Sequence, residues 1–250
     1  MKTTKSFFST VALIAAVLGS VAIIGCSDST TTPATPNKPI TPKVGSTYQF
    51  RQHERDSTAG KPATIIDTVL TVTIVRSGDT LAGMTGVVTA ISTLGDTEVY
   101  AFDANGDLNV YIPYIDASLF TLQMPAPWFR VPTFSKATSL ALGKDTSNVQ
   151  ISGYPGTVYT TATSGYLGEE TDSLIASPTI SGGKAKLDVR LDGSVLVVQA
   201  TATGQRIFAV DPNIGMYFHQ RTEFSTPAIM TISATNKVVE RWLVAYTVIK

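Results

Sequence analysis

Apolar and polar residues alternate with a period of two along most of the chain after residue 44. Residues 186–192, which read KLDVRLD, place three aliphatic side chains on one face and four charged side chains on the other. Residues 66–74 show the same alternation, and the strand-favouring residues Thr, Val, Ile and Tyr are frequent throughout. No window of a dozen residues shows the stripe of an amphipathic helix. The pattern therefore predicts an all-β domain over residues 44–250, a single antiparallel meander that forms a curved sheet or half-barrel.

The residues around Asn105-Gly106 combine turn chemistry with strand patterns on both sides. Asn-Gly favours a two-residue type I′ loop, because both residues tolerate positive φ. The opposing pairs are then Tyr100 with Tyr111, Val99 with Ile112, and Ala101 with Val110. Residues 103–107 also resemble the opening of a calcium-binding loop, but Leu108 and Tyr114 stand where that loop requires Gly and Glu. The hairpin is the favoured interpretation, with the calcium loop as its alternative.

Residues 115–144 interrupt this regular pattern. Prolines in and just before the segment prevent a long regular element; they are Pro113, Pro125, Pro127 and Pro132. We expect a long loop here, with a helical turn near residues 137–142.

The longest apolar run lies near the N-terminus, from Phe7 to Ile24. Lys2 and Lys5 precede it, so the segment has the basic start and apolar centre of an export signal. A transmembrane helix is the alternative, since the run approaches the ~20 residues that span a bilayer. Gly, Ser and Thr residues inside the run favour the signal, which would comprise residues 1–25.

Cys26 is the only cysteine, and it follows Ile23, Ile24 and Gly25 directly. These four residues resemble the lipobox of bacterial lipoproteins, which has an aliphatic first residue and a small residue before the cysteine. The resemblance implies that the Cys26 sulfur receives a diacylglycerol and that the new amino terminus is acylated. Several acyl chains anchor a protein firmly, because each buried methylene contributes about 0.8 kcal/mol. The alternative is a free thiol after ordinary secretory cleavage, which would be an unpaired reactive group.

Residues 26–43 form a linker without a core-forming segment. Prolines recur there at every third residue, which matches the turn of polyproline II; they are Pro33, Pro36, Pro39 and Pro42. We interpret the segment as an extended spacer rather than a Pro-rich recognition motif. Ser27 rather than Asp follows the cysteine, which by resemblance to lipoprotein sorting signals favours the outer membrane. The implied partners are the membrane, through Cys26, and the lipoprotein processing and sorting machinery.

Composition indicates that the domain is stabilised by apolar burial. Residues 44–250 contain no cysteine and therefore no disulfide. The chain is 43% hydrophobic and 15% charged, and a domain of about 200 residues buries about 70% of its unfolded surface. The chain contains 19 basic and 19 acidic residues. Removal of Lys2 and Lys5 with the signal would leave an excess of acidic residues. A slightly negative domain without basic clusters argues against nucleic acid as a partner.

Motifs for catalysis or metal binding are absent from the sequence. It contains no HExxH, GxSxG, P-loop or GxGxxG pattern. His53 and His219 alternate with polar and charged neighbours, so we expect both on the protein surface. The acidic residues 169–172 are expected in a loop that faces water. We therefore predict no enzyme activity, no cofactor and no metal site.

Aromatic residues are the remaining candidates for a binding site. Trp242 and Tyr246 lie on one side of the last predicted strand, which has no clearly polar face. Trp128 and Phe129 lie in the proline-rich segment and could close over a groove. We treat these four residues as candidate ligand contacts, with simple coverage of the core as the alternative.

Residues 44–48 (VGSTY) and 213–217 (NIGMY) resemble the opening and the final Gly-containing turn of a broad group of uncharacterised bacterial lipoproteins. Some of these resemble the half-barrel carriers of lipoproteins or other lipids across the periplasm. The resemblance implies no common activity, so two functions compete. One is a structural or interaction protein on the envelope, and the other is a carrier or sensor that binds an apolar ligand or lipid in a concave sheet. An enzyme is a third alternative, which would need an acid–base cluster assembled from distant residues.

The lipid anchor predicts a specific mature N-terminus. Intact mass spectrometry of the detergent-extracted protein should show Cys26 as the first residue, with acyl chains attached and residues 1–25 removed. Cys26→Ser should release the domain into the soluble fraction or block processing, because no sulfur remains to carry the diacylglycerol. A mature protein that retains Met1 would contradict this prediction.

Overall fold

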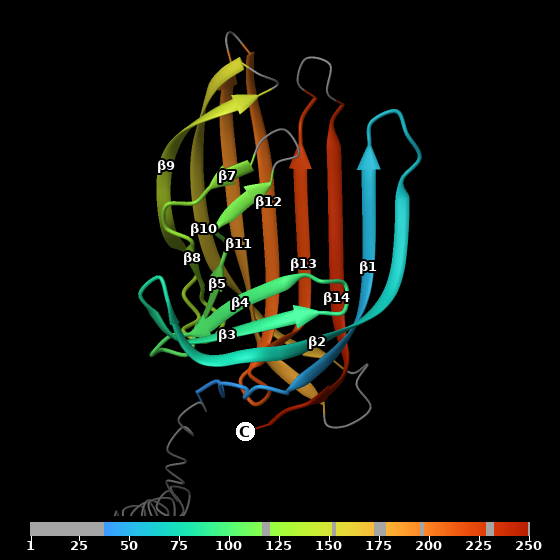
Figure 1. Cartoon of the computed structure of the whole chain (residues 1–250), viewed down its shortest axis with the longest axis vertical. Coiled ribbons are helices and arrows are strands. Elements are labelled where there is room, and N and C mark those ends of the chain that lie inside the picture. The colour runs from blue at the N-terminus through green and yellow to red at the C-terminus, as the bar shows by residue number, and fades with distance from the viewer. Residues whose placement is uncertain are drawn as a thin grey trace, which may run out of the picture. The chain divides into compact units, whose positions relative to one another are not determined.

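The computed structural model describes residues 38–116, 121–151, 154–172, 179–195, 198–228 and 233–249, so the export signal and Cys26 lie outside the described residues. All regular elements in the described residues are β-strands (Figure 1), and none of these residues belongs to a helix that could cross a membrane. The strands are β1 (Thr47–Thr58), β2 (Thr64–Leu81), β3 (Met84–Ser92), β4 (Thr97–Phe102), β5 (Leu108–Tyr111), β6 (Tyr114–Asp116), β7 (Thr121–Gln123), β8 (Trp128–Val131), β9 (Leu140–Ile151), β10 (Tyr154–Asp172), β11 (Ile180–Val195), β12 (Val198–Asp211), β13 (Met216–Thr226) and β14 (Thr235–Thr247).

Within this part of the chain, twelve strands form one antiparallel sheet in the order β8-β5-β4-β3-β2-β1-β14-β13-β12-β11-β10-β9 (Figure 1). Neighbouring strands are consecutive in sequence except at two places, where β1 pairs with β14 and β5 pairs with β8. β6 and β7 form a separate hairpin. The strands therefore follow a meander, and the two edge strands of the sheet are β8 and β9. The predicted all-β, antiparallel and curved domain is therefore confirmed.

The two edges of the sheet approach each other through the segment that joins β8 to β9. Ser164 Oγ on β10 donates a hydrogen bond to the Arg130 carbonyl on β8 (2.7 Å). Gly183 on β11 lets the same segment come close, because a Cβ there would lie 1.7 Å from the Thr133 carbonyl oxygen. The sheet is therefore nearly closed into a barrel.

The alternation of the sequence distributes side chains between the inside and the outside of this barrel. On β2, Leu70 and Ile74 are buried, whereas Val69 on the opposite face is 64% exposed. On β11, Leu187 and Leu191 are buried, while the charged residues between them lie on the other face. Each fully buried Leu or Ile contributes about 1.5–3 kcal/mol relative to its exposed state. The strands predicted around residues 66–74 and 186–192 are thus confirmed.

The hairpin formed by β4 and β5 differs from the predicted two-residue loop. Tyr100 pairs with Val110 and not with Tyr111, so residues 103–107 form the loop. The predicted register is therefore wrong by one residue. The error applies to all three predicted pairs, Tyr100–Tyr111, Val99–Ile112 and Ala101–Val110, and Ala101 pairs instead with Asn109.

The side chain of Asp103 explains the longer loop. Its carboxylate accepts hydrogen bonds from the N–H groups of Asn105 (2.8 Å) and Asp107 (3.1 Å), which favours a turn that begins at Asp103. Gly106 has a φ of 86° and donates its N–H to the Asp103 carbonyl (2.9 Å). Only Gly106 therefore needs the left-handed conformation, whereas a type I′ turn would have required it of Asn105 as well.

The described part of residues 115–144 contains more strand than the sequence predicts. β7, β8 and the start of β9 lie in this range. No helical turn forms at residues 137–142, because Leu140 already pairs with Ser164 on β10. Pro127 precedes β8 and Pro132 follows it, so these prolines border a strand that pairs with β5.

The end of the predicted linker packs against the domain. The Ile40 N–H donates a hydrogen bond to the Pro212 carbonyl (2.9 Å). Pro42 is buried, and Ser77 Oγ donates to its carbonyl (2.7 Å). The compact unit accordingly spans Asn37–Lys250 and includes residues that the sequence analysis assigned to the spacer.

A buried carboxylate ties the β4–β5 loop to the segment that closes the barrel. Asp107 is fully buried and accepts hydrogen bonds from Arg130 Nη2 (2.6 Å) and from the N–H groups of Phe134 (2.9 Å) and Ser135 (2.7 Å). Burial alone would raise the pKa of Asp107, but the hydrogen bonds from Ser135, Phe134 and Arg130 lower it below its ordinary value. The ionised carboxylate therefore stabilises the folded state.

Removal of this charge should destabilise the domain. Asp107→Asn should lower the free energy of unfolding by about 3 kcal/mol at pH 7, because a buried oxygen that accepts hydrogen bonds from Arg130 or from the N–H groups of Phe134 and Ser135 becomes an NH2 donor. Since folding lowers the pKa of Asp107, its contribution is present above pH ~4 and is lost as the pH falls through the folded-state pKa. Urea unfolding of both proteins at several pH values measures the two effects.

Asp67→Asn is the matched control for this substitution. Asp67 pairs with His53, and 55% of the Asp67 side chain is exposed. Loss of such a surface pair should cost no more than about 1 kcal/mol. Equal losses in the two variants would refute the anchoring role of Asp107.

Candidate functional site

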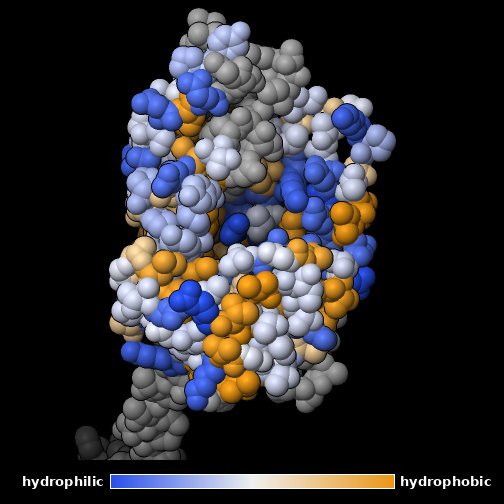
Figure 2. Space-filling view, viewed as in Figure 1, coloured by the Kyte–Doolittle hydropathy of each residue, from blue (hydrophilic) through white to orange (hydrophobic). Residues whose placement is uncertain are grey.

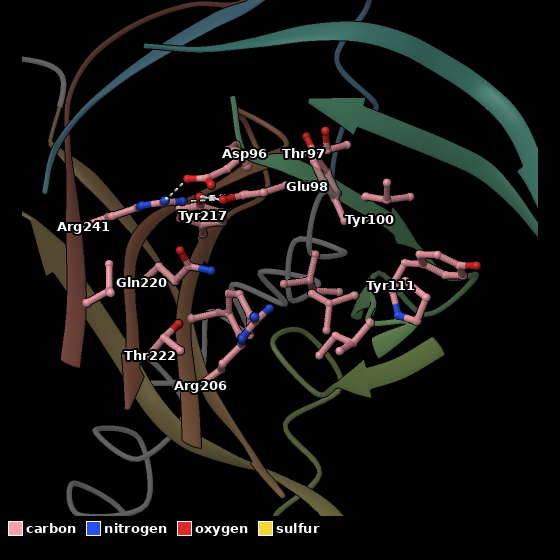
Figure 3. A pocket seen from close by; sticks show the side chains of 18 of the residues that line it. Asp96, Thr97, Glu98, Tyr100, Tyr111, Arg206, Tyr217, Gln220, Thr222 and Arg241 are labelled. Carbon is pink, nitrogen blue, oxygen red and sulfur yellow. Dashed lines mark hydrogen bonds and ion pairs between the residues drawn. The ribbon is translucent and has the colours of Figure 1, made fainter. Parts of the chain in front are cut away.

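The barrel interior contains a cavity of about 410 Å³ that is lined by residues of β4, β5 and β12–β14 (Figure 3). Figure 2 shows a hollow in this face of the molecule next to β3 and β4. The volume falls within the range of small-molecule sites, about 300–1,000 Å³. Both apolar and polar side chains line the cavity, among them Val110, Ile112, Phe208, Met216, Glu98, Arg206, Gln220 and Arg241.

A second cavity of about 320 Å³ adjoins the first and is more apolar. Its apolar lining includes Ile115, Phe129, Leu187, Val189 and Phe224. Four residues line both cavities, namely Ile112, Tyr114, Arg206 and Thr222. The two volumes therefore meet at these side chains.

Cross-strand pairing explains why the polar residues face the interior together. Directly opposed residues of an antiparallel sheet project to the same face. Arg206 on β12 is opposite Leu187 on β11 and Thr222 on β13. Gln220 lies two residues from Thr222 on the same face, opposite Arg241 on β14. Period-two alternation thus brings residues far apart in the sequence into one interior row.

Arg241 is buried in a network of acceptors at the wall of the first cavity (Figure 3). Its Nε donates to Gln52 Oε1 (2.6 Å), its Nη2 to Asp96 Oδ2 (3.2 Å) and its Nη1 to Glu98. Tyr217 OH also donates to Glu98 Oε2 (2.8 Å). Burial acts to lower the pKa of Arg241, but Tyr217 and Glu98 raise it overall. Two carboxylates thus share one guanidinium, and these bonds link Glu98 on β4, Tyr217 on β13 and Arg241 on β14 at the wall of the cavity.

Arg206 projects into the cavity without such partners (Figure 3). No residue in the described part of the chain forms a hydrogen bond or an ion pair with its guanidinium. Burial lowers the pKa of Arg206, with Glu98 and Tyr217 opposing the change, and an arginine stays protonated at neutral pH. Arg206 is only partly buried, so its guanidinium donors face the water-accessible cavity and are available to a ligand, which makes this group a candidate binding group.

The four aromatic candidates from the sequence do not come together. Phe129 lines the second cavity. Trp128, its neighbour on β8, projects to the opposite face, where its Nε1 donates to the Leu81 carbonyl (3.0 Å). Trp242 likewise lies on the outer face, because Arg241 beside it takes the interior position. Tyr246 packs against the hydrophobic core.

The histidines and the acidic segment lie in surroundings that the sequence only partly indicates. His53 is partly exposed, in line with a surface position. His219 lies between Glu170 Oε1 (2.5 Å) and Glu240 Oε1 (2.9 Å) and stacks on Trp242, and only 12% of its side chain is exposed. Residues 169–172 belong to β10, so their predicted place in a loop is wrong.

Comparison with known proteins adds little to this description. No family model and no curated protein matches the sequence. Among solved structures, the hypothetical lipoprotein YmcC from Escherichia coli (K12) aligns with 98% of this chain and 99% of its own, at 11% sequence identity and a TM-score of 0.31. Values this low transfer neither fold nor function. The site is therefore interpreted from its own residues.

Proposed function

We propose that this chain is a lipoprotein of the cell envelope, anchored in the outer membrane through Cys26, which carries or senses an apolar small molecule inside its β domain. The pair of adjoining, partly apolar cavities supports ligand binding, whereas the anchor rests on the lipobox-like residues 23–26. Protein interiors are otherwise close-packed, with few voids larger than a water molecule. An open interior with a small number of polar groups is typical of a ligand site.

The chemistry of the lining supports binding rather than catalysis. Glu98 and Arg241, the charged pair at the wall, are bonded to each other. Neither His53 nor His219 is among the residues that line the two cavities. Asp96 and Glu98, the carboxylates that line the first cavity, both accept hydrogen bonds from Arg241 and so belong to the wall network. The function that fits these side chains is retention of a ligand.

A structural or interaction role is the second candidate, and the outer surface favours it. Ile65 and Val69 on β2 are 59% and 64% exposed, and Ile91 on β3 is 41% exposed. Ile65 and Val69 share the outer face of one strand, because they are separated by an even number of residues. Exposed apolar side chains on one face often bind a partner protein. Such a surface is compatible with a ligand inside the barrel.

Filling the second cavity should abolish ligand retention. Native mass spectrometry of the mature protein, extracted from its own membranes in mild detergent, should show a small molecule retained by the chain. Val189→Trp should lower the retained fraction at least about tenfold, because the indole ring occupies space that the ligand needs.

Arg190→Trp is the matched control, because it places the same indole ring at the neighbouring residue on the outer face. It should retain the ligand as the wild type does. A wild-type protein without any retained molecule, or undiminished retention by Val189→Trp, would rule out the proposed function.

A further inference from the structure

Three polar side chains converge where the two cavities meet. Arg206 and Thr222 are opposite each other on β12 and β13, and Gln220 lies two residues away on the same face. All three line the first cavity (Figure 3), and Arg206 and Thr222 also line the second. Across the described ranges, none of these three side chains has a hydrogen-bond or ion-pair partner.

Arg206 is the charged group of this cluster that forms no ion pair with the described residues. Glu98 and Asp96 both bind Arg241, and Glu98 accepts a further hydrogen bond from Tyr217. Glu98 acts on Arg206 electrostatically but makes no bond with it. The planar guanidinium of Arg206 therefore keeps its N–H donors available, in the fork geometry that matches a carboxylate or a phosphate.

The second cavity supplies the other half of a site for an amphiphile. Phe129, Leu187, Val189 and Phe224 give it an apolar lining. It begins at Arg206 and Thr222, so a molecule with its polar head at these residues can extend an apolar chain along Leu187 and Val189. The apolar contact area favours chain burial, while the polar groups fix the position of the head.

We infer that the ligand is an amphiphile with an anionic head, which binds Arg206, Gln220 and Thr222 while its apolar chain occupies the second cavity. This inference rests on the proposed function, since it specifies the ligand of the same interior site. The guanidinium provides the charge-assisted hydrogen bonds. The Gln220 amide and the Thr222 hydroxyl provide neutral donors to the remaining oxygen lone pairs.

Three probes with the same chain test the inference, namely dodecanoate, dodecyl phosphate and dodecanol. Each is titrated into the mature protein after removal of endogenous ligand, and binding is measured by native mass spectrometry. The wild type should bind dodecanoate or dodecyl phosphate at least about tenfold more tightly than dodecanol, because hydrogen bonds to charged groups are stronger than neutral ones. The tighter of the two anions identifies the head as a carboxylate or a phosphate.

Variants of Arg206 separate the head site from the chain site. Arg206→Met should remove the preference for the anion and leave dodecanol binding within about twofold, because the apolar cavity persists. Arg206→Lys should keep part of the preference, since the charge remains without the fork geometry. Arg190→Met removes an exposed cation from the outer face and should change nothing.

The possible failures are distinguishable. If the wild type binds none of the three probes, the proposed function fails together with this inference. If it binds dodecanol as tightly as the anions, or if Arg206→Met keeps the anion preference, the proposed function stands and the role of Arg206 is refuted. If Arg206→Met binds no probe, retention of the anion preference by Arg206→Lys supports the inference, and loss of it overturns the inference.

Discussion

Closure of the sheet between the β8–β9 segment and strands β10 and β11 is the contact on which the rest of the structure depends. The Thr133 carbonyl occupies the space where any other residue at Gly183 would place its Cβ. The Tyr166 N–H donates to the Ala137 carbonyl (2.8 Å), which adds a second backbone link across the same gap. Asp107 fixes this segment from the β4–β5 side. Without these contacts, the free edge of β8 and the part of β10 that extends beyond β9 would be open to water and to pairing with other chains.

Closure of the sheet changes the environment of the polar residues on the inner face, and with it the free energy of their interactions. In an enclosed interior, an unpaired polar group costs free energy, and an electrostatic contact is stronger than at the surface. The guanidinium of Arg241 is paired, because acceptors in the protein bind it. Arg206 has no such acceptor among the described residues, and its donors face the cavity. Partial enclosure by the barrel strengthens the contacts of the wall network, and it would likewise strengthen contacts between Arg206 and an anion.

Local patterns in the sequence predict the strands well, because period-two alternation alone determines which side chains share a face. The same logic fails where another local interaction competes, as when the Asp103 carboxylate shifts the β4–β5 register. It also fails for long-range contacts, since nothing local indicates that β1 pairs with β14 or that β8 meets β10. For the site, Phe129 was predicted as a candidate contact and lines a cavity, whereas Arg206 was missed. The sequence does contain an indication of Arg206, because this residue lies two positions before Phe208 and therefore on the same, interior face of the strand.

The central claim is that closure leaves one interior arginine paired within the protein and the other available to a ligand. The free energies of unfolding of Arg241→Met and Arg206→Met, measured by urea denaturation without ligand, test it most directly. Arg241→Met should lose about 3 kcal/mol, because Gln52 and the partly buried Glu98 lose the buried guanidinium that donates to both. Arg206→Met should stay within about 1 kcal/mol of the wild type, because Arg206 forms no hydrogen bond or ion pair with the described residues. Similar losses in both variants would contradict the account, since they would show that Arg206 serves the fold.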